Sequence, residues 1–479
     1  MKYETVIGLE VHIELSTNTK IFCACSAHSF GAEPNTHVCP VCLGMPGALP
    51  VLNKKVVDYA IRAGMMLGCN INRTSTFDRK SYFYPDLPNA YQITQYFSPI
   101  ATGGTVEIET ANGKKSIRIH EMHMEEDAGK LVHDIKEGLS HIDFNRAGVP
   151  LLEIVSCPDL SSADEVEAYL ERIKTLLRYA RVAECEMAHG TMRCDVNLSV
   201  RPVGCDTLGV RTEMKNMNSI EAIKRAIEFE TARHIDALEC GGKILQETRR
   251  WDDVGGKTVP MRSKETAGDY RYAPNPDLMP LVLDADWIES VQATLPEFPE
   301  IKRQRYMQAY GLSLYDAEQL TRSISFCECF EAATAVCNSP KDAANWMTGE
   351  VMSLLNAQKM TCDMLSLSGE KLGELIRLVM DGKVGRANAK IILSTLFEND
   401  NLDLFAYAEE NGFLITNDTA NIERVVKAVV DADAKSVADY KGGKEKALMF
   451  LFGKCMKELK GNCDPQLLRK ILCDYIAKS

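Results

Sequence analysis

The first strand-like segment of the chain alternates apolar and ionisable side chains. Over residues 9–14 three apolar residues alternate with three ionisable ones, namely Leu9, Val11 and Ile13 with Glu10, His12 and Glu14. Successive side chains of a strand point to opposite faces, so one face is apolar and the other carries Glu, His and Glu in a row. A water-facing antiparallel strand explains this pattern without any function. However, the row accumulates negative charge with no cation beside it, and a bound divalent metal would offset that charge.

The same alternation recurs further along the chain. Residues 193–201 and 210–215 alternate in this way, and residues 123–127 (His-Met-Glu-Glu-Asp) form a further acidic cluster. Several strands that each have an apolar face and an acid-rich face predict one antiparallel sheet with an open polar surface. Carboxylates with one or two imidazoles are ligands for hard cations, so Mg²⁺ or Mn²⁺ is the expected metal.

Two amphipathic helices are predicted to pack against the apolar back of this sheet. Ser162 and Glu165 form a capping-box pattern, which is followed by apolar residues at helical spacing, namely Val166, Tyr169, Leu170, Ile173, Leu176 and Leu177. The second helix should begin near Ser219 and end at Gly241, because glycine tolerates the left-handed conformation of a C-cap. Its apolar face is predicted to consist of Ile220, Ile223, Ile227, Ile235 and Leu238.

Beyond about residue 290 the pattern becomes helical, which predicts an α+β protein with three parts. A proline-containing linker at residues 295–299 separates a sheet domain (1–294) from a helical domain (295–400). A small helical tail (401–479) follows, with apolar stripes at Ile422, Val425, Val426 and Val429 and at Ala447, Leu448, Leu451 and Phe452.

Composition and charge narrow the function classes. With 479 residues, 45% hydrophobic and 25% charged, the chain is typical of globular proteins, which excludes a disordered, collagen-like or disulfide-scaffold protein. The net charge is −12, yet residues 441–479 alone contain nine basic and four acidic residues, a balance of +5. This positive end suits contact with a polyanion, although a solvated helix surface explains it equally simply.

The sequence also predicts the cellular compartment. The seventeen cysteines are odd in number and mostly scattered, the N-terminus lacks the pattern of a signal peptide, and no apolar run is long enough to span a bilayer. We therefore expect a reduced, soluble, cytoplasmic protein.

Four cysteines form a more specific pattern. Cys23 and Cys25 are followed, thirteen residues after Cys25, by the pair Cys39 and Cys42. Two close pairs of thiols joined by a short loop can form a tetrahedral zinc site, and four thiolates leave no open position for a substrate. The expected zinc is therefore structural, within a loop at 23–42, with His28 and His37 as reserve ligands. A redox role of the CxxC pair is the competing interpretation.

Phosphate chemistry requires cations, and several basic residues lie near the polar strands. Arg79 and Lys80 precede an aromatic run, residues 82–84, and Arg193 and Lys215 belong to the alternating segments. Any of them is a candidate to neutralise a phosphate or a developing charge.

Over essentially its whole length, the chain resembles the B subunit of the aspartyl/glutamyl-tRNA(Asn/Gln) amidotransferase. The resemblance rests on long motifs at residues 6–12 (VIGLEVH), 77–80 (FDRK), 82–86 (YFYPD), 123–130 (HMEEDAGK), 145–153 (NRAGVPLLE), 193–195 (RCD) and 269–272 (DYRY). It implies a cradle domain similar to the antiparallel sheet of glutamine synthetase, then a helical domain, then a small helical tail of the type that engages tRNA.

The resemblance also implies a reaction and partners. In this family an amidase, the A subunit, frees ammonia from glutamine, and a small third protein, the C subunit, completes a heterotrimer. The B subunit uses ATP and Mg²⁺ to phosphorylate the side-chain carboxylate of mischarged Glu-tRNA(Gln) or Asp-tRNA(Asn), and ammonia then forms the amide. The chain is thus expected to belong to a carbon–nitrogen ligase of translation that takes glutamine as its amido donor. The alternatives are a tRNA-binding scaffold that no longer reacts and a stand-alone metal-dependent nucleotidyl or phosphate enzyme.

The implied roles are assigned to residues by position. The expected magnesium ligands are Glu10, His12, Glu125 and Asp195. The weaker candidates for binding ATP or substrate are Arg79, Lys80, Arg193 and Lys215. The positive end becomes a tRNA-contacting tail, with Lys441, Lys444, Lys446, Lys454 and Lys457 as candidate contacts.

Overall fold

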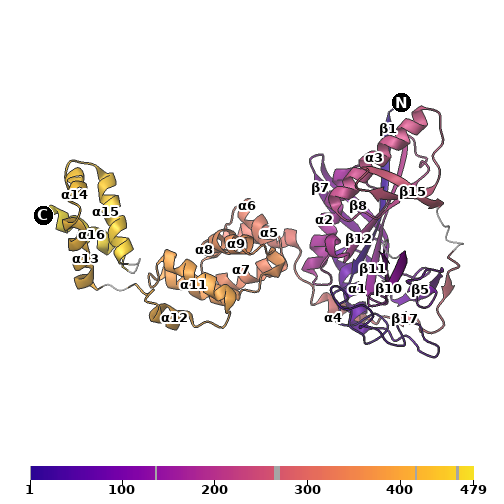
Figure 1. Cartoon of the computed structure of the whole chain (residues 1–479), viewed down its shortest axis with the longest axis horizontal. Coiled ribbons are helices and arrows are strands. Elements are labelled where there is room, and N and C mark those ends of the chain that lie inside the picture. Colours follow the sequence, from indigo (N-terminus) through magenta and orange to yellow (C-terminus); the bar gives the residue numbers. More distant parts are fainter. Residues whose placement is uncertain (1, 135–137, 264–269, 416–417, 460–462, 479) are drawn as a thin grey trace. The chain divides into compact units, whose positions relative to one another are not determined.

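The computed structural model describes residues 2–134, 138–263, 270–415, 418–459 and 463–478. Asp269, from one of the motifs above, lies outside these ranges. The chain divides into two compact units, residues 1–298 and 299–479, which are described separately below (Figure 1). The division falls within the proline-containing linker, and Pro299 opens the first helix of the second unit, a position that suits proline. The expected limits at 294 and 400 stay predictions.

The first unit contains all the strands found among the described residues. They are β1 (Tyr3–Glu14), β2 (Asn70–Ile71), β3 (Thr74–Ser75), β4 (Asp78–Ser81), β5 (Tyr91–Thr94), β6 (Ala101–Thr102), β7 (Thr105–Thr110), β8 (Gly113–Glu126), β9 (Lys130–Asp134), β10 (Leu139–Asp143), β11 (Pro150–Ser156), β12 (Met192–Pro202), β13 (Thr212–Lys215), β14 (Glu247–Asp252), β15 (Lys257–Ser263), β16 (Ala273–Pro274) and β17 (Leu281–Val282). Its helices are α1 (Lys54–Met66), α2 (Ala163–Tyr179), a 3₁₀ turn η1 (Met187–His189), α3 (Ile220–Glu239) and α4 (Ala285–Gln292).

One large sheet forms the scaffold of the first unit. Its strand order is β15-β14-β13-β12-β1-β11-β8-β6-β2, with β7 paired to β8. The predicted α+β class is confirmed, but the sheet is mixed, because β13 and β14 run parallel while their neighbours pair antiparallel. The long helix α3 connects β13 to β14, which allows the chain to return in the same direction.

The central strands bury one face and leave the other more open, as the alternation predicts. Leu9, Val11 and Ile13 of β1 are 1%, 0% and 0% exposed, whereas Glu10 and His12 are half-buried. Helices α2 and α3 pack together, and α3 contacts β12 and β15 (Figure 1). The ionisable residues of β1 therefore belong to a face that the apolar core does not cover.

The two predicted helices are confirmed, with one difference. The Ser162 side chain accepts a hydrogen bond from the Glu165 N–H at the start of α2, as the capping pattern requires. In α3, which Ser219 caps, the far end of the predicted apolar face is only half-buried, and Glu230 and His234 are buried instead. Glu230 accepts hydrogen bonds from its neighbours His234, Arg233 and Thr258, so its buried charge is fully paired.

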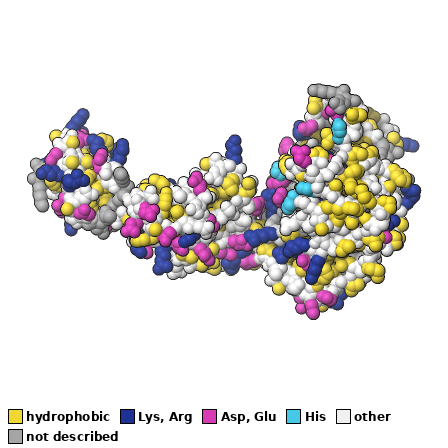
Figure 2. All heavy atoms as spheres, turned by 60° about the horizontal axis from the view of Figure 1, so that its bottom comes forward, with side chains coloured by type: hydrophobic (Ala, Val, Ile, Leu, Met, Phe, Trp, Pro, Cys, Tyr) yellow, Lys and Arg dark blue, Asp and Glu magenta, His cyan; other side chains and the backbone are white. Residues whose placement is uncertain are grey.

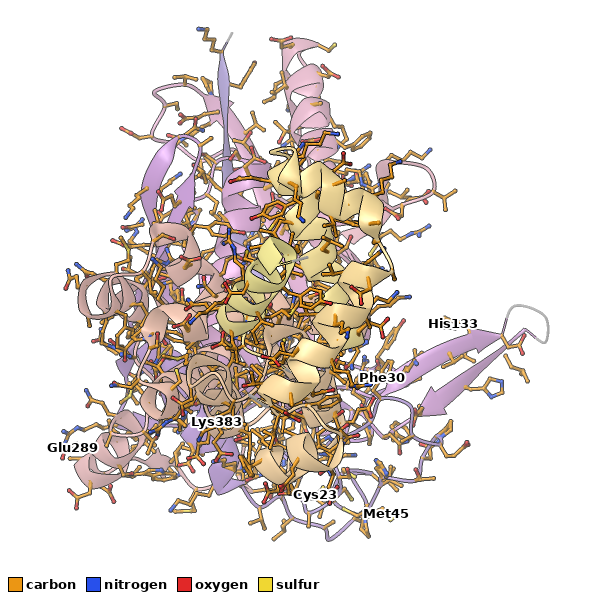
Figure 3. The ribbon with its side chains drawn as sticks, turned by 90° about the vertical axis from the view of Figure 1, so that its left-hand side faces the viewer. Cys23, Phe30, Met45, His133, Glu289 and Lys383 are labelled. Atoms are coloured by element: carbon orange, nitrogen blue, oxygen red, sulfur yellow. The ribbon has the colours of Figure 1, made fainter. Side chains whose placement is uncertain are left out.

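Smaller sheets complete the first unit. Strands β4, β5 and β16 form one, β3 and β17 form another, and β9 and β10 form a hairpin. This hairpin projects from the body of the unit, with His133 near its outer end (Figure 3).

The second unit is helical in its described residues. It contains α5 (Pro299–Tyr310), α6 (Leu314–Leu320), α7 (Ile324–Cys337), α8 (Pro340–Trp346), a π-helical turn η2 (Met347–Val351), α9 (Met352–Ala357), a 3₁₀ turn η3 (Cys362–Met364), α10 (Gly369–Met380), α11 (Arg386–Glu398), α12 (Leu404–Glu410), α13 (Thr419–Asp431), α14 (Ala434–Lys441), α15 (Glu445–Glu458) and α16 (Pro465–Lys478). Two separate hydrophobic clusters lie in it, one within residues 306–408 and one within 422–476. Ile422 and Val426 of α13 and Leu448 and Leu451 of α15 belong to the second cluster, as their stripes predict.

Two general features bear on the compartment. All seventeen cysteines are free thiols. Within the described part of the chain, every helix is too short or too polar to cross a membrane.

Candidate active site

The polar face of the large sheet carries ionisable side chains on five neighbouring strands. Strand pairing places His12 of β1 opposite Glu153 of β11, and Glu153 in turn opposite His123 of β8. On the other side of β1, Glu10 lies opposite Asp195 of β12. Side chains directly opposite each other in a sheet share a face. Residues far apart in sequence are therefore brought together on one surface.

The first cluster consists of His12, Glu125 and Glu153. One side-chain ligand atom from each of these residues lies within 4.8 Å of the others. The His12 Nε2 is 3.5 Å from a Glu153 carboxylate oxygen, and the Nε2 of the buried His123 forms a hydrogen bond of 2.8 Å with that same oxygen. Glu125 is only 3% exposed. Two carboxylates and an imidazole thus converge in a largely water-excluded place.

Electrostatic coupling within this cluster is strong. Burial alone would raise the pKa of Glu153, but the imidazoles of His123 and His12 outweigh it and hold that pKa well below its ordinary value. Burial likewise opposes protonation of His123, yet the Glu153 carboxylate raises the His123 pKa to about 9. Glu153 is therefore ionised at neutral pH and available as a ligand.

Glu125 is oriented by a side chain from the small sheet. The Gln92 amide of β5 donates hydrogen bonds to the Glu125 carboxylate and, at 2.6 Å, to the backbone carbonyl of Glu126. The Tyr82 hydroxyl donates to the Gln92 amide oxygen at 3.3 Å. Outer partners of this kind fix the direction of a metal-binding carboxylate.

The second cluster consists of Glu10, Asp195 and Glu213, whose ligand atoms also lie within 4.8 Å of one another. The Lys215 ammonium lies among them, 2.5 Å from an Asp195 oxygen and 3.4 Å from a Glu213 oxygen. The Asn197 amide donates to Glu10 at 2.9 Å. Burial, and then the carboxylates of Glu153 and Glu213, raise the pKa of Glu10.

The four expected magnesium ligands are thus divided between the two clusters. His12 and Glu125 belong to the first, and Glu10 and Asp195 belong to the second. Among the described residues no single group of mutually close ligand atoms contains all four. Glu153 and Glu213 were missed as cluster members, although the sequence places Glu213 on the polar side of its strand. All four residues stay predictions as magnesium ligands.

The four candidate cations occupy different environments. Arg79 is bound to Asp277 at 2.6 Å, Arg193 to Asp127 at 2.7 Å, and Lys215 to the second cluster. In contrast, Lys80 makes no ion pair within the described part of the chain, and its ammonium lies 5.1 Å from the centre of the Tyr270 ring. Burial opposes the charge of Lys80, but the carboxylates of Glu125 and Glu153 raise its pKa well above the ordinary value. Lys80 is therefore the candidate that faces the first cluster.

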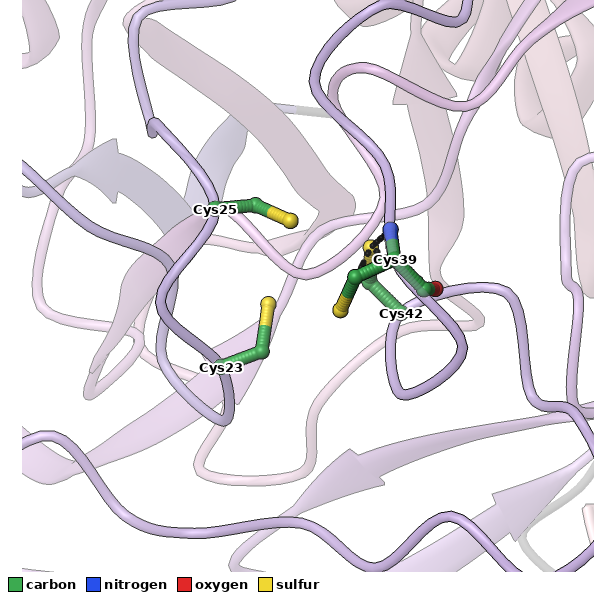
Figure 4. Close-up of side chains that lie close together, drawn as sticks. All are labelled: Cys23, Cys25, Cys39 and Cys42. Atoms are coloured by element: carbon green, nitrogen blue, oxygen red, sulfur yellow. Dashed lines mark hydrogen bonds between the residues drawn. The ribbon is translucent and has the colours of Figure 1, made fainter.

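The four predicted zinc ligands also come together. The sulfur atoms of Cys23, Cys25, Cys39 and Cys42 all lie within 4.8 Å of one another (Figure 4). The Cys39 and Cys42 sulfurs are 3.9 Å apart, close to the roughly 3.8 Å edge of a tetrahedron with zinc–sulfur bonds of about 2.3 Å. A hydrogen bond from Cys23, together with the nearby Lys20 ammonium, lowers the Cys42 pKa to about 4. His28 and His37 lie outside this group.

The tail lysines are all exposed, but they differ in their partners. Lys444 is paired with Asp439 at 2.9 Å, and Lys454 is paired with Asp433 at 2.7 Å. In the described residues no ion pair is formed by Lys441, Lys446 or Lys457, so their charges are directed to solvent.

Comparison with known proteins decides the family. Residues 5–289 match the family model described as "GatB/GatE catalytic domain", and residues 328–476 match the one described as "GatB domain". The B subunit of the aspartyl/glutamyl-tRNA(Asn/Gln) amidotransferase of Agathobacter rectalis is 51% identical over 474 residues, which cover 99% of each chain. The chain belongs to this family of amidotransferase B subunits.

Other members of the family are equally similar over their full length. The B subunit of Caldanaerobacter subterraneus subsp. tengcongensis is 50% identical with complete coverage of both chains. That of Lachnoclostridium phytofermentans is 49% identical, covering 100% of this chain and 99% of its own. The family name implies an amidotransferase built from several subunits, so both clusters described above lie in the catalytic domain of one of them.

Proposed function

We propose that this chain catalyses ATP- and Mg²⁺-dependent phosphorylation of the side-chain carboxylate of Glu-tRNA(Gln), Asp-tRNA(Asn) or both, followed by amidation with ammonia. An amidase, the A subunit, supplies the ammonia from glutamine, and the small C subunit completes the heterotrimer. The observation that carries this proposal is that Lys80, which lies opposite Gln92 in the pairing of β4 with β5, faces the first cluster, so that one face offers both metal ligands and a cation for phosphate.

The chemistry explains why ATP is required. Ammonia cannot displace oxide from a carboxylate, whereas an acyl phosphate offers phosphate as a leaving group. In the first step a carboxylate oxygen of the aminoacyl group bonds to the γ-phosphorus of ATP, and the bond from that phosphorus to the β-phosphate oxygen breaks to give ADP. Ammonia then adds to the acyl carbon, loses a proton, and phosphate departs with the electron pair of its bond to carbon.

The residues of the first cluster fit magnesium. Two ligand atoms on opposite sides of a Mg²⁺ ion, each at about 2.1 Å, are roughly 4.2 Å apart. The atoms from His12, Glu125 and Glu153 lie within 4.8 Å of one another, so the ion requires little side-chain movement. Three protein ligands leave positions for phosphate oxygens. Magnesium bound there would neutralise charge on the transferring phosphoryl group.

Other residues of the site have supporting roles. Lys80 binds the γ-phosphate or the substrate carboxylate, since its charge is not committed to an ion pair in the described chain. Gln92 and His123 are positioning residues, which orient the carboxylates of Glu125 and Glu153 through the hydrogen bonds described above. In the second cluster, the Lys215 ammonium offsets the negative charge of Glu10 and Asp195.

The tail and the cysteine loop have separate roles in the proposal. The exposed lysines of residues 441–479 contact tRNA phosphates, which makes tRNA binding sensitive to salt. The four cysteines bind a structural zinc ion, because their sulfurs lie within 4.8 Å of one another and the Cys39–Cys42 separation of 3.9 Å matches the edge of a tetrahedral site.

Exposed apolar surface supports the expectation of protein partners. Figure 2 shows hydrophobic side chains over much of the visible face of the first unit. The large apolar side chains exposed in this unit include Phe30, Met45, Leu49, Phe83 and Phe97. Where such side chains form a contiguous patch, the surface is typical of proteins that assemble with others.

The decisive experiment separates the two half-reactions. The purified heterotrimer is incubated with ATP, Mg²⁺ and Glu-tRNA(Gln) without any ammonia source, and ADP formation is followed. Glu125→Gln should abolish ADP formation dependent on charged tRNA, while glutamine hydrolysis stays measurable. The matched control is Glu4→Gln, which alters a β1 carboxylate that is paired with Arg201 at 2.6 Å, away from either cluster. A normal rate of ADP formation by the Glu125 variant would refute the proposal.

The scaffold alternative gives a different outcome. A tRNA-binding scaffold would bind mischarged tRNA but would not form ADP, and variants of either cluster would leave amidation unchanged. A stand-alone phosphate enzyme would form ADP without charged tRNA.

A further inference from the structure

Lys20 is buried in an unusual way. Its side chain is 0% exposed, and it lies next to the four-cysteine site rather than within the active-site face. A fully buried lysine is rare unless a negative group accompanies it, because an unpaired ammonium loses its hydration. Within the described residues no carboxylate lies within ion-pair distance of Lys20. Its negative partner must therefore be of another kind.

The polar neighbours of the Lys20 ammonium identify that partner. Its Nζ lies 3.5 Å from the Cys42 sulfur and 3.3 Å from the backbone carbonyl oxygen of Phe144. Packing is close on the same side: a Cβ placed on Gly148 would come within 3.5 Å of the Lys20 stem and 3.7 Å of the Cys42 Cβ. The ammonium is thus held between a thiol of the cluster and the chain segment that follows β10.

The charge of the cysteine site depends on whether it holds metal. Without metal the site carries the charge of the Cys42 thiolate, whose pKa is lowered to about 4, whereas four thiolates around Zn²⁺ carry a net charge of −2. The partly negative cluster would compensate the buried ammonium, and a hydrogen bond from a cation to a ligand sulfur would in turn stabilise the thiolate. We propose that Lys20 is the internal counter-ion of a zinc-loaded four-cysteine site and fastens that site to the base of the β9–β10 hairpin. This inference rests on the proposed zinc site.

The loop between the two cysteine pairs binds the same segment. The Asn35 amide donates to the Ile142 carbonyl at 2.9 Å and its oxygen accepts from the Phe144 N–H at 2.8 Å. The His37 N–H donates to Asn145 at 2.8 Å. The cysteine loop and Lys20 therefore both bind residues 142–145, where strand β10 of the projecting hairpin ends. By ordering the cysteine loop, zinc would also hold residues 142–145 in position.

The test compares two lysine variants with a matched buried lysine. Lys20→Met removes the charge at similar volume, and Lys20→Arg retains it. The control is Lys302→Met, which removes a lysine that is 6% exposed but is paired with the Glu331 carboxylate at 2.8 Å in the other unit. For the full-length chain, zinc content is measured by elemental analysis, and the rate of zinc release to EDTA is followed.

The expected results follow from charge compensation. Wild type should hold about one zinc ion per chain. Lys20→Met should release zinc about 10–100-fold faster, which is the usual cost of losing an outer partner of a metal site, whereas Lys20→Arg should stay within about threefold. Lys302→Met should melt at a lower temperature but retain zinc as wild type does. If Lys20→Met does not fold, Lys20→Gln, which retains a donor for the Phe144 carbonyl, replaces it in every comparison.

A thermal measurement gives a dependence on zinc that a purely structural role of Lys20 would not. With zinc bound, Lys20→Met should melt below wild type. After zinc has been stripped, the melting shift caused by Lys20→Met should be smaller, since the buried charge then faces only the Cys42 thiolate. Equal melting shifts in both states, or zinc release as slow as in Lys302→Met, would overturn the inference. The inference would also be overturned if Glu126→Gln removed the effect of Lys20→Met. That result would make Glu126, and not the cysteine site, the partner of Lys20. Absence of zinc from wild type would refute the zinc proposal itself. The proposed amidotransferase function is tested separately, and normal ADP formation by either lysine variant would leave it intact.

Discussion

Glu153→Gln perturbs a carboxylate that lies close to both His12 and His123 on the active-site face. A Glu153 oxygen lies 2.8 Å from the His123 Nε2 and 3.5 Å from the His12 Nε2. The substitution conserves volume and leaves an amide oxygen that still accepts a hydrogen bond from His123. It removes one of the two carboxylates in the first cluster, so that Glu125 remains as the sole charged ligand.

The size of the effect follows from the number of ligands lost. Loss of a partner outside the ligand shell typically costs 10–100-fold in metal affinity, so loss of a ligand together with its charge should cost at least about 100-fold, or roughly 2.7 kcal/mol. Divalent affinity is measured with Mn²⁺ by electron paramagnetic resonance of the free ion, using the full-length chain. ADP formation by the complex should fall in parallel.

Glu4→Gln again serves as the control, because Glu4 lies on the neighbouring strand β1 but is paired with Arg201. The Glu4 variant should bind Mn²⁺ as wild type does. A Glu153 variant that melts normally and binds Mn²⁺ within threefold of wild type would refute the assignment of the first cluster as the metal site.

Four further predictions test other parts of the account. Lys80→Met should reduce ADP formation at least tenfold in steady-state assays, whereas Arg79→Met, which loses only a paired cation, should reduce it less. Burial would raise the Glu230 pKa, but hydrogen bonds from His234, Arg233 and Thr258 lower it from 4.5 to about 2. Glu230→Gln should therefore lower the free energy of unfolding by about 3 kcal/mol at pH 7, as measured by denaturant unfolding. Because the folded pKa is depressed, this stabilisation is present above pH 4.5 and is lost as pH falls toward 2; a cost that stayed constant between pH 7 and pH 3 would contradict it. Reversing the charge of both Lys446 and Lys457 should weaken tRNA binding. The slope of the logarithm of the binding constant against the logarithm of salt concentration should become shallower by about 1.5, whereas an unchanged slope would mean that these lysines are only solvated. Cys39→Ser should lower both zinc content and melting temperature, and a variant with normal melting would count against a structural zinc site.

The strand and helix patterns were predictable where burial is governed by local periodicity. The alternation in β1 and the Ser162 cap of α2 are local signals, and the structure confirms both. The far end of α3 was not predictable in this way. Its buried face is polar because Thr258, from β15, reaches Glu230, and that contact depends on the return of the chain through β14 and β15.

The membership of the active-site clusters depended on strand register. Glu153 lies in a segment whose neighbours are almost all apolar, so the segment resembles a fully buried strand with an isolated acid. Only the pairing of β11 between β1 and β8 places that acid between His12 and His123. Similarly, the sequence presents Lys215 as a free cation, whereas pairing of β13 beside β12 commits it to Asp195. For Glu153, the signal available in the sequence was a single glutamate within an otherwise apolar strand.

The central claim is that His12, Glu125 and Glu153 together hold the divalent ion of the ATP-dependent step. Anomalous diffraction from crystals of the complex grown with Mn²⁺ and a non-hydrolysable ATP analogue tests it directly. The account predicts an anomalous peak at bonding distance from all three side chains, with the analogue's phosphates beside Lys80. A peak at another place, or none at this cluster while the analogue is bound, would contradict it.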